Sequence, residues 1–323
     1  MKSGLTERVR NACKTVAERA SHVRIDYDRV PSYAASLPLE QSTAPELDPE
    51  HHYFGDPDKT VAFLLTLDAI NFGSGYFPHL RKRPGMSGYF TLAASLTDHY
   101  REHSSLSAQE LARLTAEDCA RIFGQDLNNE PVRELMGLFV TALNDLGRYL
   151  IDHFDGNFTG LVEEAGASAE RLARLLVEMP YFDDVEPYDG IEVPFYKRAQ
   201  LTPADLAVAF EGKGPGRFED LNRLTIFADN LVPHVLRVDG IILYEEGLAA
   251  RIDAEELIPP GSPEEVEIRA CAIHAVEQLI GELRAAGRDD VTAMRLDYLL
   301  WNRGQQPYYK RVRPRHRTRT VFY

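Results

Sequence analysis

Residues 218–244 read FEDLNRLTIFADNLVPHVLRVDGIILY, and the fold that we expect is organised around this stretch. Its apolar residues mostly recur with the period of a helix, so most of the stretch should pack inward. Asp229 and Asn230 interrupt the pattern, and Pro233 follows, a residue that fits the first turn of a helix but breaks its interior. The pattern predicts a helix that ends near Phe227, a corner at 228–232 and a second helix from about Pro233.

This arrangement places the Asp229 carboxylate at the start of a helix, beside free backbone N–H groups and positive dipole potential. Two interpretations of Asp229 remain open at this point. An ordinary N-cap is the simpler one, because Asp and Asn lead the ranking of capping residues. The other is a carboxylate that takes part in chemistry.

Composition predicts a globular protein with a sizeable core: 323 residues, 44% hydrophobic and 27% charged. No apolar run approaches the length of a membrane span, and the first twenty residues lack the apolar centre of a signal peptide. Cys13, Cys119 and Cys271 are far apart, which suits a reducing cytoplasm and matches no metal spacing. We therefore expect a cytoplasmic protein, a monomer, with no membrane partner, no cofactor and no metal.

The balance of charge argues against a long polyanion as the ligand. The chain has 36 Lys and Arg against 50 Asp and Glu, a net charge of −14. The one basic concentration along the sequence is the tail at 308–323, which has six Lys or Arg and no acid. Proteins that grip nucleic acid normally present a basic face. The composition therefore disfavours intact nucleic acid and permits a mononucleotide.

The fold class that we predict is mainly α, with a few short strands. Cap residues followed by proline or glutamate mark helix starts at Asp56, Ser107, Thr202 and Ser262. Short strands are expected at 22–27, in a hairpin around 191–193 and in the alternating Arg-rich end. No linker separates independent parts, so we expect one domain over 1–323, with a helical part at about 1–180 packed on another at about 181–323.

Two further carboxylates lie on apolar helix stripes: Asp68, and Asp297 beside the only tryptophan, Trp301. Such a carboxylate either holds a buried partner or points into a polar pocket. Asn71 and Phe72 follow Asp68 and could read a flat polar ring, although a glycine-rich turn packed by its own aromatics is an equal explanation. Adjacent Lys197 and Arg198, just before the helix start expected at 202–203, could meet a phosphate or form a surface pair.

Several segments taken together resemble the queuosine salvage protein family. They are LDAINF (67–72), GYF (88–90), FYKRAQ (195–200), EGKGPGRF (211–218), FADNLVPHVL (227–236), EVEIRAC (265–271), LDYLLW (296–301) and HRTRTVFY (316–323). The resemblance implies a glycosidase that releases queuine from queuosine 5′-monophosphate. It also implies a mostly helical fold similar to the helix-hairpin-helix DNA glycosylases, with Asp229 as the catalytic residue.

The resemblance also assigns roles to the other candidates. Lys197 and Arg198 would hold the 5′-phosphate, and Asp68, Asn71 and Asp297 would contact the base or its cyclopentenediol. Phe72, Phe227 and Trp301 would stack, and Tyr196 and His234, from the same motifs, would line the substrate site. Two other classes stay open: a DNA or RNA base glycosylase, which needs a cationic track, and a non-catalytic helical nucleotide-binding module.

Overall fold

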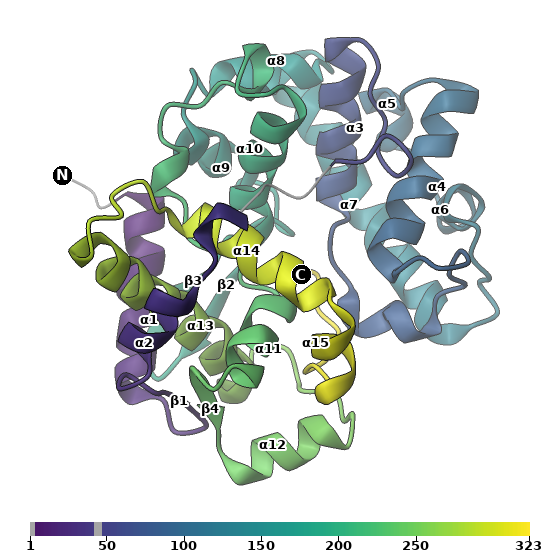
Figure 1. The fold of residues 1–323 in the computed structure, drawn as a ribbon. Helices are drawn as coiled ribbons and strands as arrows, with labels where there is room; N and C mark the ends of the chain where they lie inside the picture. The colour runs from purple at the N-terminus through teal and green to yellow at the C-terminus, as the bar shows by residue number, and fades with distance from the viewer. Residues whose placement is uncertain (1–3, 42–46) are drawn as a thin grey trace. The chain divides into compact units, whose positions relative to one another are not determined.

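The computed structural model describes residues 4–41 and 47–323, and it is mainly helical with two short two-stranded sheets (Figure 1). This confirms the predicted fold class. The chain forms two compact units: unit 1 comprises residues 1–45, 184–200 and 220–319, and unit 2 comprises 46–183, 201–219 and 320–323. The first helices of the chain therefore belong to the unit that holds most of the C-terminal half. The single domain over 1–323 stays a prediction.

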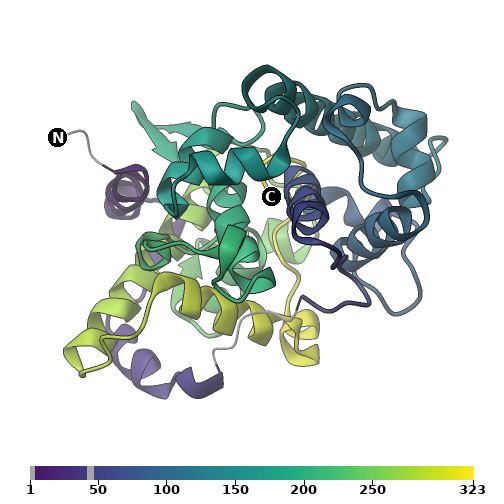
Figure 2. The same cartoon turned by 90° about the horizontal axis from the view of Figure 1, so that it is seen from above.

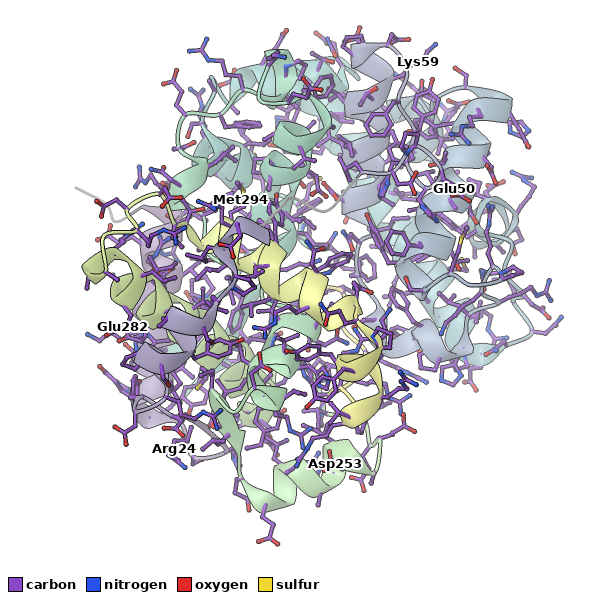
Figure 3. All side chains as sticks on the ribbon, viewed as in Figure 1. Arg24, Glu50, Lys59, Asp253, Glu282 and Met294 are labelled. Carbon is purple, nitrogen blue, oxygen red and sulfur yellow. The ribbon has the colours of Figure 1, made fainter. Side chains whose placement is uncertain are left out.

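Unit 1 is built on α13 (Pro263–Ala285), which packs against α1, α2, α11, α14 and β1. The apolar face of this helix, which includes Ile268, Cys271 and Leu279, is fully buried. Charged side chains such as Arg24, Asp253 and Glu282 lie at the surface of this unit (Figure 3). Its other elements are α1 (Leu5–Arg19), β1 (Val23–Ile25), α2 (Val30–Ser36), η1 (Leu39–Gln41), β2 (Val185–Tyr188), β3 (Ile191–Pro194), η4 (Leu221–Arg223), α11 (Leu231–Val238), β4 (Ile242–Tyr244), α12 (Glu246–Asp253), α14 (Ala293–Gln305) and α15 (Pro307–Val312).

Both sheets of the described chain are antiparallel and lie in unit 1. β1 pairs with β4, with Val23 opposite Tyr244. β2 and β3 form the predicted hairpin, seen in teal in Figures 1 and 2. Its two-residue turn is Asp189-Gly190, with φ of 43° and 77°. Asp-Gly with two positive φ angles is the favoured two-residue hairpin connection. The turn thereby fixes the register of the two strands, with Val185 opposite Pro194.

Unit 2 is organised on the long helix α7 (Glu130–Phe154), against which α3, α5, α6 and α8 pack. Gly147 permits the close approach of α7 to the end of α5, because a Cβ there would lie 2.4 Å from the Ala112 backbone N. No helix in the described residues is long and apolar enough to cross a bilayer. The other elements of unit 2 are α3 (Pro57–Ala69), η2 (Ser74–His79), α4 (Gly88–His103), α5 (Ala108–Leu111), α6 (Ala116–Phe123), α8 (Phe158–Glu164), α9 (Ala169–Leu176), most of α10 (Lys197–Ala209) and η3 (Gly214–Gly216).

Most of the helix starts predicted from caps are confirmed. Asp56 accepts a hydrogen bond from the Lys59 N–H at 3.0 Å, and Ser107 and Ser262 cap α5 and α13 in the same way. The start expected at Thr202 is wrong, because α10 begins at Lys197 and contains Pro203 in its interior. The cap comes from a distant residue: the Lys197 N–H donates to Asp184 Oδ2 at 3.1 Å. Lys197 and Arg198 therefore lie in the first turn of the helix.

The helix expected to end near Phe227 is also wrong. Only a 3-10 turn, η4, forms there, and the chain is then irregular and mostly buried up to Asn230. The second helix, α11, is confirmed, although it begins at Leu231, two residues before Pro233. The strand expected in the Arg-rich end does not form, since the described residues there make one isolated bridge, from Arg317 to Leu257.

Candidate functional site

Asp229 stands at the start of α11, as predicted. Its Oδ1 accepts hydrogen bonds from the N–H groups of Leu231, at 2.7 Å, and Val232, at 3.2 Å. Both bonds are made by one oxygen of a half-buried carboxylate. The capping role is therefore real, and it occupies one side of the carboxylate. The two interpretations of Asp229 are compatible.

The segment that leads into Asp229 is held by side chains from three different helices. Gln200 of α10 accepts from the Thr225 N–H at 2.9 Å. Asp297 of α14 accepts from the Phe227 N–H at 2.8 Å, and Arg269 of α13 donates to the Ala228 carbonyl at 3.0 Å. These bonds replace the helical ones that the apolar pattern predicts for 218–227. Backbone groups that would pair along a helix are paired across the core instead.

Asp297 lies among charged neighbours that include Asp229. Burial raises the pKa of the Asp297 carboxyl well above its usual range, and the Asp229 carboxylate raises it further. The Phe227 N–H and the Lys197 ammonium partly oppose this rise. The structure thus brings together Asp229, Asp297, Phe227 and Lys197 in unit 1. Two carboxyl groups in different environments are suited to different roles, and the raised pKa favours the protonated form of Asp297.

The turn before α10 is strained. Tyr196 has a φ of 51°, in the left-handed region, and its side chain is buried. A bulky residue in this region is uncommon, and such residues cluster at functional sites. The next two residues, Lys197 and Arg198, are 6% and 1% exposed. This excludes the interpretation of Lys197 and Arg198 as a surface pair.

No hydrogen bond or ion pair among the described residues joins His234 or Trp301, the other unit 1 candidates, to Asp229. His234 Nε2 lies 2.8 Å from the Tyr309 carbonyl, and burial lowers the pKa of His234 to about 4. A neutral imidazole that donates to a backbone carbonyl is typical of a structural histidine. Trp301 is half-buried on α14, one turn beyond Asp297. The substrate-binding roles of His234 and Trp301 stay predictions.

The remaining three candidates, Asp68, Asn71 and Phe72, belong to unit 2. Asp68 is fully buried at the end of α3, and its charge, with that of Asp205, adds to the effect of burial in raising the pKa of Tyr89. Phe72 packs edge-on against Phe139 at 5.2 Å between ring centroids, which is the packing of a core aromatic. The roles of these three residues in substrate binding stay predictions.

Several residues that hold or neighbour the segment 225–229 are not predicted as site residues by the sequence. Tyr298 of α14 has its ring 6.5 Å from that of Phe227. Desolvation lowers the pKa of the Arg315 guanidinium and the Asp229 carboxylate partly restores it, which places Arg315 of the basic tail near Asp229. Arg269 and Gln200 were present in quoted motifs, but a motif alone does not show which of its residues point inward. Asp184 lies in an acidic loop and carries no local signal.

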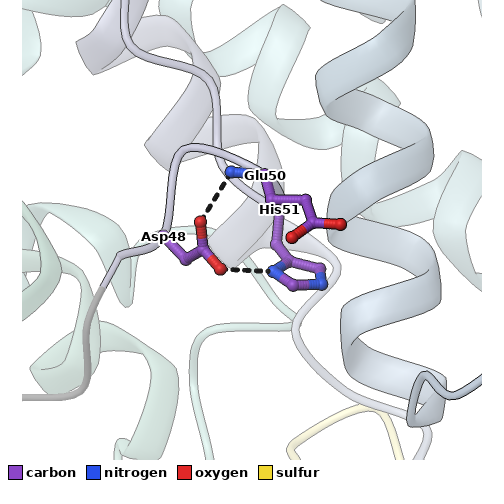
Figure 4. A group of neighbouring side chains, drawn as sticks. All are labelled: Asp48, Glu50 and His51. Carbon is purple, nitrogen blue, oxygen red and sulfur yellow. Dashed lines mark hydrogen bonds and ion pairs between the residues drawn. The ribbon is translucent and has the colours of Figure 1, made fainter.

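Three side chains that could hold a metal ion lie together in unit 2, in a segment for which the sequence predicts no metal site. Ligand atoms of Asp48, Glu50 and His51 are within 4.8 Å of one another (Figure 4). Asp48 already accepts from the Glu50 N–H at 2.7 Å and lies 3.2 Å from His51 Nδ1. These bonds account for the turn without an ion.

We expect that metal removal leaves activity intact. The candidate site around Asp229 is made of carboxylates, a lysine and backbone groups whose partners are protein groups. The measurement is turnover before and after extensive dialysis against EDTA, with the melting temperature as a control for folding. Loss of turnover that a divalent ion restores would contradict this expectation.

Glu186 of β2 gives a pH-dependent stability. Burial and the nearby Glu265 raise the pKa of Glu186 from 4.5 to about 7. The unfolded chain therefore releases this proton at lower pH than the folded one, so stability falls as pH rises from about 4.5 to 7. We expect the fall in the free energy of unfolding with rising pH to be about 1–2 kcal/mol smaller in Glu186→Gln. This value is lower than for a fully buried group, because solvent screens the half-exposed Glu186 side chain.

The measurement for Glu186→Gln is urea unfolding of both proteins at pH 5 and pH 8. The variant should gain stability relative to the wild type between the two values. An unchanged difference would show that Glu186 titrates normally.

Comparison with known proteins gives a consistent result over nearly the whole chain. A family model described as Queuosine salvage protein matches residues 51–323. A protein of Sphaerobacter thermophilus named queuosine 5′-phosphate N-glycosylase/hydrolase is 38% identical over 315 residues, which is 96% of each chain. Proteins of the same name from Mus musculus and Dictyostelium discoideum are 31% and 32% identical, covering 97% and 86% of this chain and 98% and 83% of their own.

Proposed function

The chain belongs to the queuosine salvage protein family, and from this premise we propose that it hydrolyses queuosine 5′-monophosphate to queuine and ribose 5-phosphate. The observation that carries the proposal is the match over almost the full length of relatives that bear this activity in their name. The geometry around Asp229 supports it, because a carboxylate fixed at a helix start lies near a second carboxyl and a buried lysine.

The substrate decides what the site must supply. Queuine is a 7-deazaguanine, so the ring position that is N7 in guanine is a carbon and cannot be protonated to improve the leaving base. The enzyme must therefore obtain more of its transition-state stabilisation from interactions with the sugar, which resembles an oxocarbenium ion in the transition state. A carboxylate held near C1′ can stabilise that charge, activate water or attack directly. We assign this position to Asp229.

The other residues take supporting roles in this proposal. Lys197 and Arg198, in the first turn of α10, bind the 5′-phosphate through their charged side chains. Asp297 offers hydrogen bonds to the base, and Phe227 and Trp301 offer faces on which it can stack. Tyr196 and His234 line the same site. For the unit 2 candidates Asp68, Asn71 and Phe72, a role in recognising the base or its cyclopentenediol stays a prediction from the resemblance alone.

The test is incubation of the purified protein with queuosine 5′-monophosphate, queuosine and guanosine 5′-monophosphate, with product identification by mass spectrometry. We expect queuine and ribose 5-phosphate in equal amounts from the first substrate and no base from guanosine 5′-monophosphate. Equal cleavage of guanosine 5′-monophosphate would show a general nucleotidase-type glycosidase. Absence of base from all three would leave a binding module.

One observation favours a second candidate, a glycosylase acting on nucleic acid. Unit 2 contains a groove of about 760 Å³ lined by Arg81, Lys82, Arg83 and Arg121, so basic residues gather outside the tail as well. Asp98 and Glu102 line the same groove, and Arg83 is paired with Asp98 at 2.7 Å. A net excess of two cations is small beside the six or more phosphate contacts of a typical nucleic-acid binder. We therefore place this candidate second.

The proposal extends to the fold relationship, the oligomeric state and the cellular compartment. We propose that the fold is related to the helix-hairpin-helix DNA glycosylases, on the ground that it is mainly helical with the assigned aspartate at a helix start. The irregular segment before Asp229 differs from a helical hairpin, so superposition of α11 and its neighbours on such a glycosylase is the check. We also propose a monomer that acts in the cytoplasm, which sedimentation and localisation of a tagged chain would test.

A further inference from the structure

Arg269 and Asp184 form an ion pair that is completely enclosed in unit 1. Arg269 Nη1 and Nη2 donate to Asp184 Oδ1 and Oδ2 at 2.9 and 2.6 Å, and both side chains are almost inaccessible to solvent. The Arg269 guanidinium also lies over the Phe195 ring, 3.9 Å from its centroid. The bidentate ion pair and the contact with the Phe195 ring together fix the plane of the guanidinium, so the Arg269 side chain has a single orientation.

Each member of the pair bonds to a different part of the candidate site. Arg269 Nε donates to the carbonyl of Ala228, the residue before Asp229, at 3.0 Å. Asp184 Oδ2 accepts from the Lys197 N–H at 3.1 Å, and the Asp184 carbonyl accepts from the Phe195 N–H at 2.8 Å. One continuous chain of hydrogen bonds therefore runs from the backbone of Lys197 to the backbone next to Asp229.

A contribution to the stability of the fold is a weak explanation for the buried ion pair between Arg269 and Asp184. Removing two charges from water is costly, and buried ion pairs can often be replaced by apolar residues without loss of stability. What an apolar replacement cannot reproduce is the geometry: three donors of one planar group aimed at a carboxylate and at a particular carbonyl. The ion pair therefore fixes the positions of two backbone segments. One carries the Asp229 carboxylate, and the other is the turn at Lys197 and Arg198 to which we assign phosphate binding.

We propose that Arg269 and Asp184 are positioning residues that set the placement of Asp229 relative to Lys197 and Arg198. The proposal rests on the function proposed above. Neither residue touches the substrate; they hold the backbone on which the acting groups stand. In the proposed reaction, binding of the 5′-phosphate fixes the sugar, and the Asp229 carboxylate must then lie near C1′. A misplacement of about 1 Å between two such groups can cost about 100-fold in rate.

The test uses Arg269→Lys, which keeps the charge but loses the planar fork and the Nε donor to Ala228. We expect kcat on queuosine 5′-monophosphate to fall about 100-fold with KM changed less than about threefold, because ground-state binding survives while the transition-state geometry is lost. Asp184→Asn should give a similar loss. The double variant should lose no more than the larger single loss, because the two residues act as one unit.

The matched control is Arg237→Lys. Arg237 is also a buried arginine of unit 1, paired with Asp253 at 2.9 Å, and no hydrogen bond or ion pair among the described residues joins it to 225–229. It should lower the melting temperature comparably and leave kcat within about threefold. Equal losses of kcat in Arg269→Lys and Arg237→Lys would overturn the proposal, as would a rise in KM with kcat unchanged. Inactive wild-type protein would instead refute the proposed function.

Discussion

Asp229→Asn should abolish turnover of queuosine 5′-monophosphate while leaving the fold intact. The loss should be on the order of 10³-fold or more, because a carboxylate that meets developing positive charge in a site of low dielectric supplies a large part of the rate. Asparagine retains an Oδ1, which is the only atom of Asp229 that caps α11. Asn and Asp are equivalent as caps, so the free energy of unfolding should change by less than about 1 kcal/mol.

The measurements for Asp229→Asn are kcat, the melting temperature and the affinity for the substrate. Unchanged affinity with lost turnover is the expected combination. The matched control is Asp239→Asn, at the other end of α11, which should retain turnover. Near-normal activity of a folded Asp229→Asn protein would remove Asp229 from the mechanism and leave only its hydrogen bonds to the first turn of α11.

Arg198→Ala should discriminate between the monophosphate and the free nucleoside. If Arg198 binds the 5′-phosphate, kcat/KM on queuosine 5′-monophosphate should fall about 10- to 100-fold, the value of one or two hydrogen bonds between charged groups. Activity on queuosine, which has no phosphate, should change little. Because Arg198 is buried, Arg198→Lys and a melting curve are needed to separate lost binding from lost stability.

Lys197→Ala should show a mixed effect. The Lys197 ammonium lowers the pKa of the Asp297 carboxyl, and in the proposed function it also binds the 5′-phosphate, so part of the loss should extend to queuosine. The matched controls are Lys213→Ala and Arg217→Ala, which remove exposed cations beyond the end of α10. Equal losses on nucleotide and nucleoside for both Lys197→Ala and Arg198→Ala would show that the pair is structural.

Helix starts that depend on nearby residues could be predicted from the sequence. Asp56, Ser107 and Ser262 each bond to an N–H three residues later, and a pattern that short is visible along the chain. The start of α10 could not be, since its cap is Asp184, 13 residues earlier. The irregular segment before Asp229 depends on partners 25, 70 and 41 residues away, at Gln200, Asp297 and Arg269.

The same limit explains which site residues were found. Asp297 is conspicuous because a carboxylate interrupts an apolar stripe. Arg269 and Glu267 lie on α13 where an amphipathic pattern assigns polar residues to solvent, yet both are fully buried. Glu267 is satisfied by the N–H groups of His22 and Val23, 245 and 244 residues away. A helix whose charged face is paired across the core cannot be distinguished from a surface helix by its period alone.

The most direct test of the central claim uses queuosine-containing tRNA, before and after nuclease digestion to 5′-monophosphates, with queuine release followed by mass spectrometry. We expect release only after digestion. The phosphate pocket that we propose at Lys197 and Arg198 would close the 5′ side of the substrate, and a chain with net charge −14 repels a polyanion. Release from undigested tRNA at a comparable rate would contradict the account and favour the nucleic-acid glycosylase.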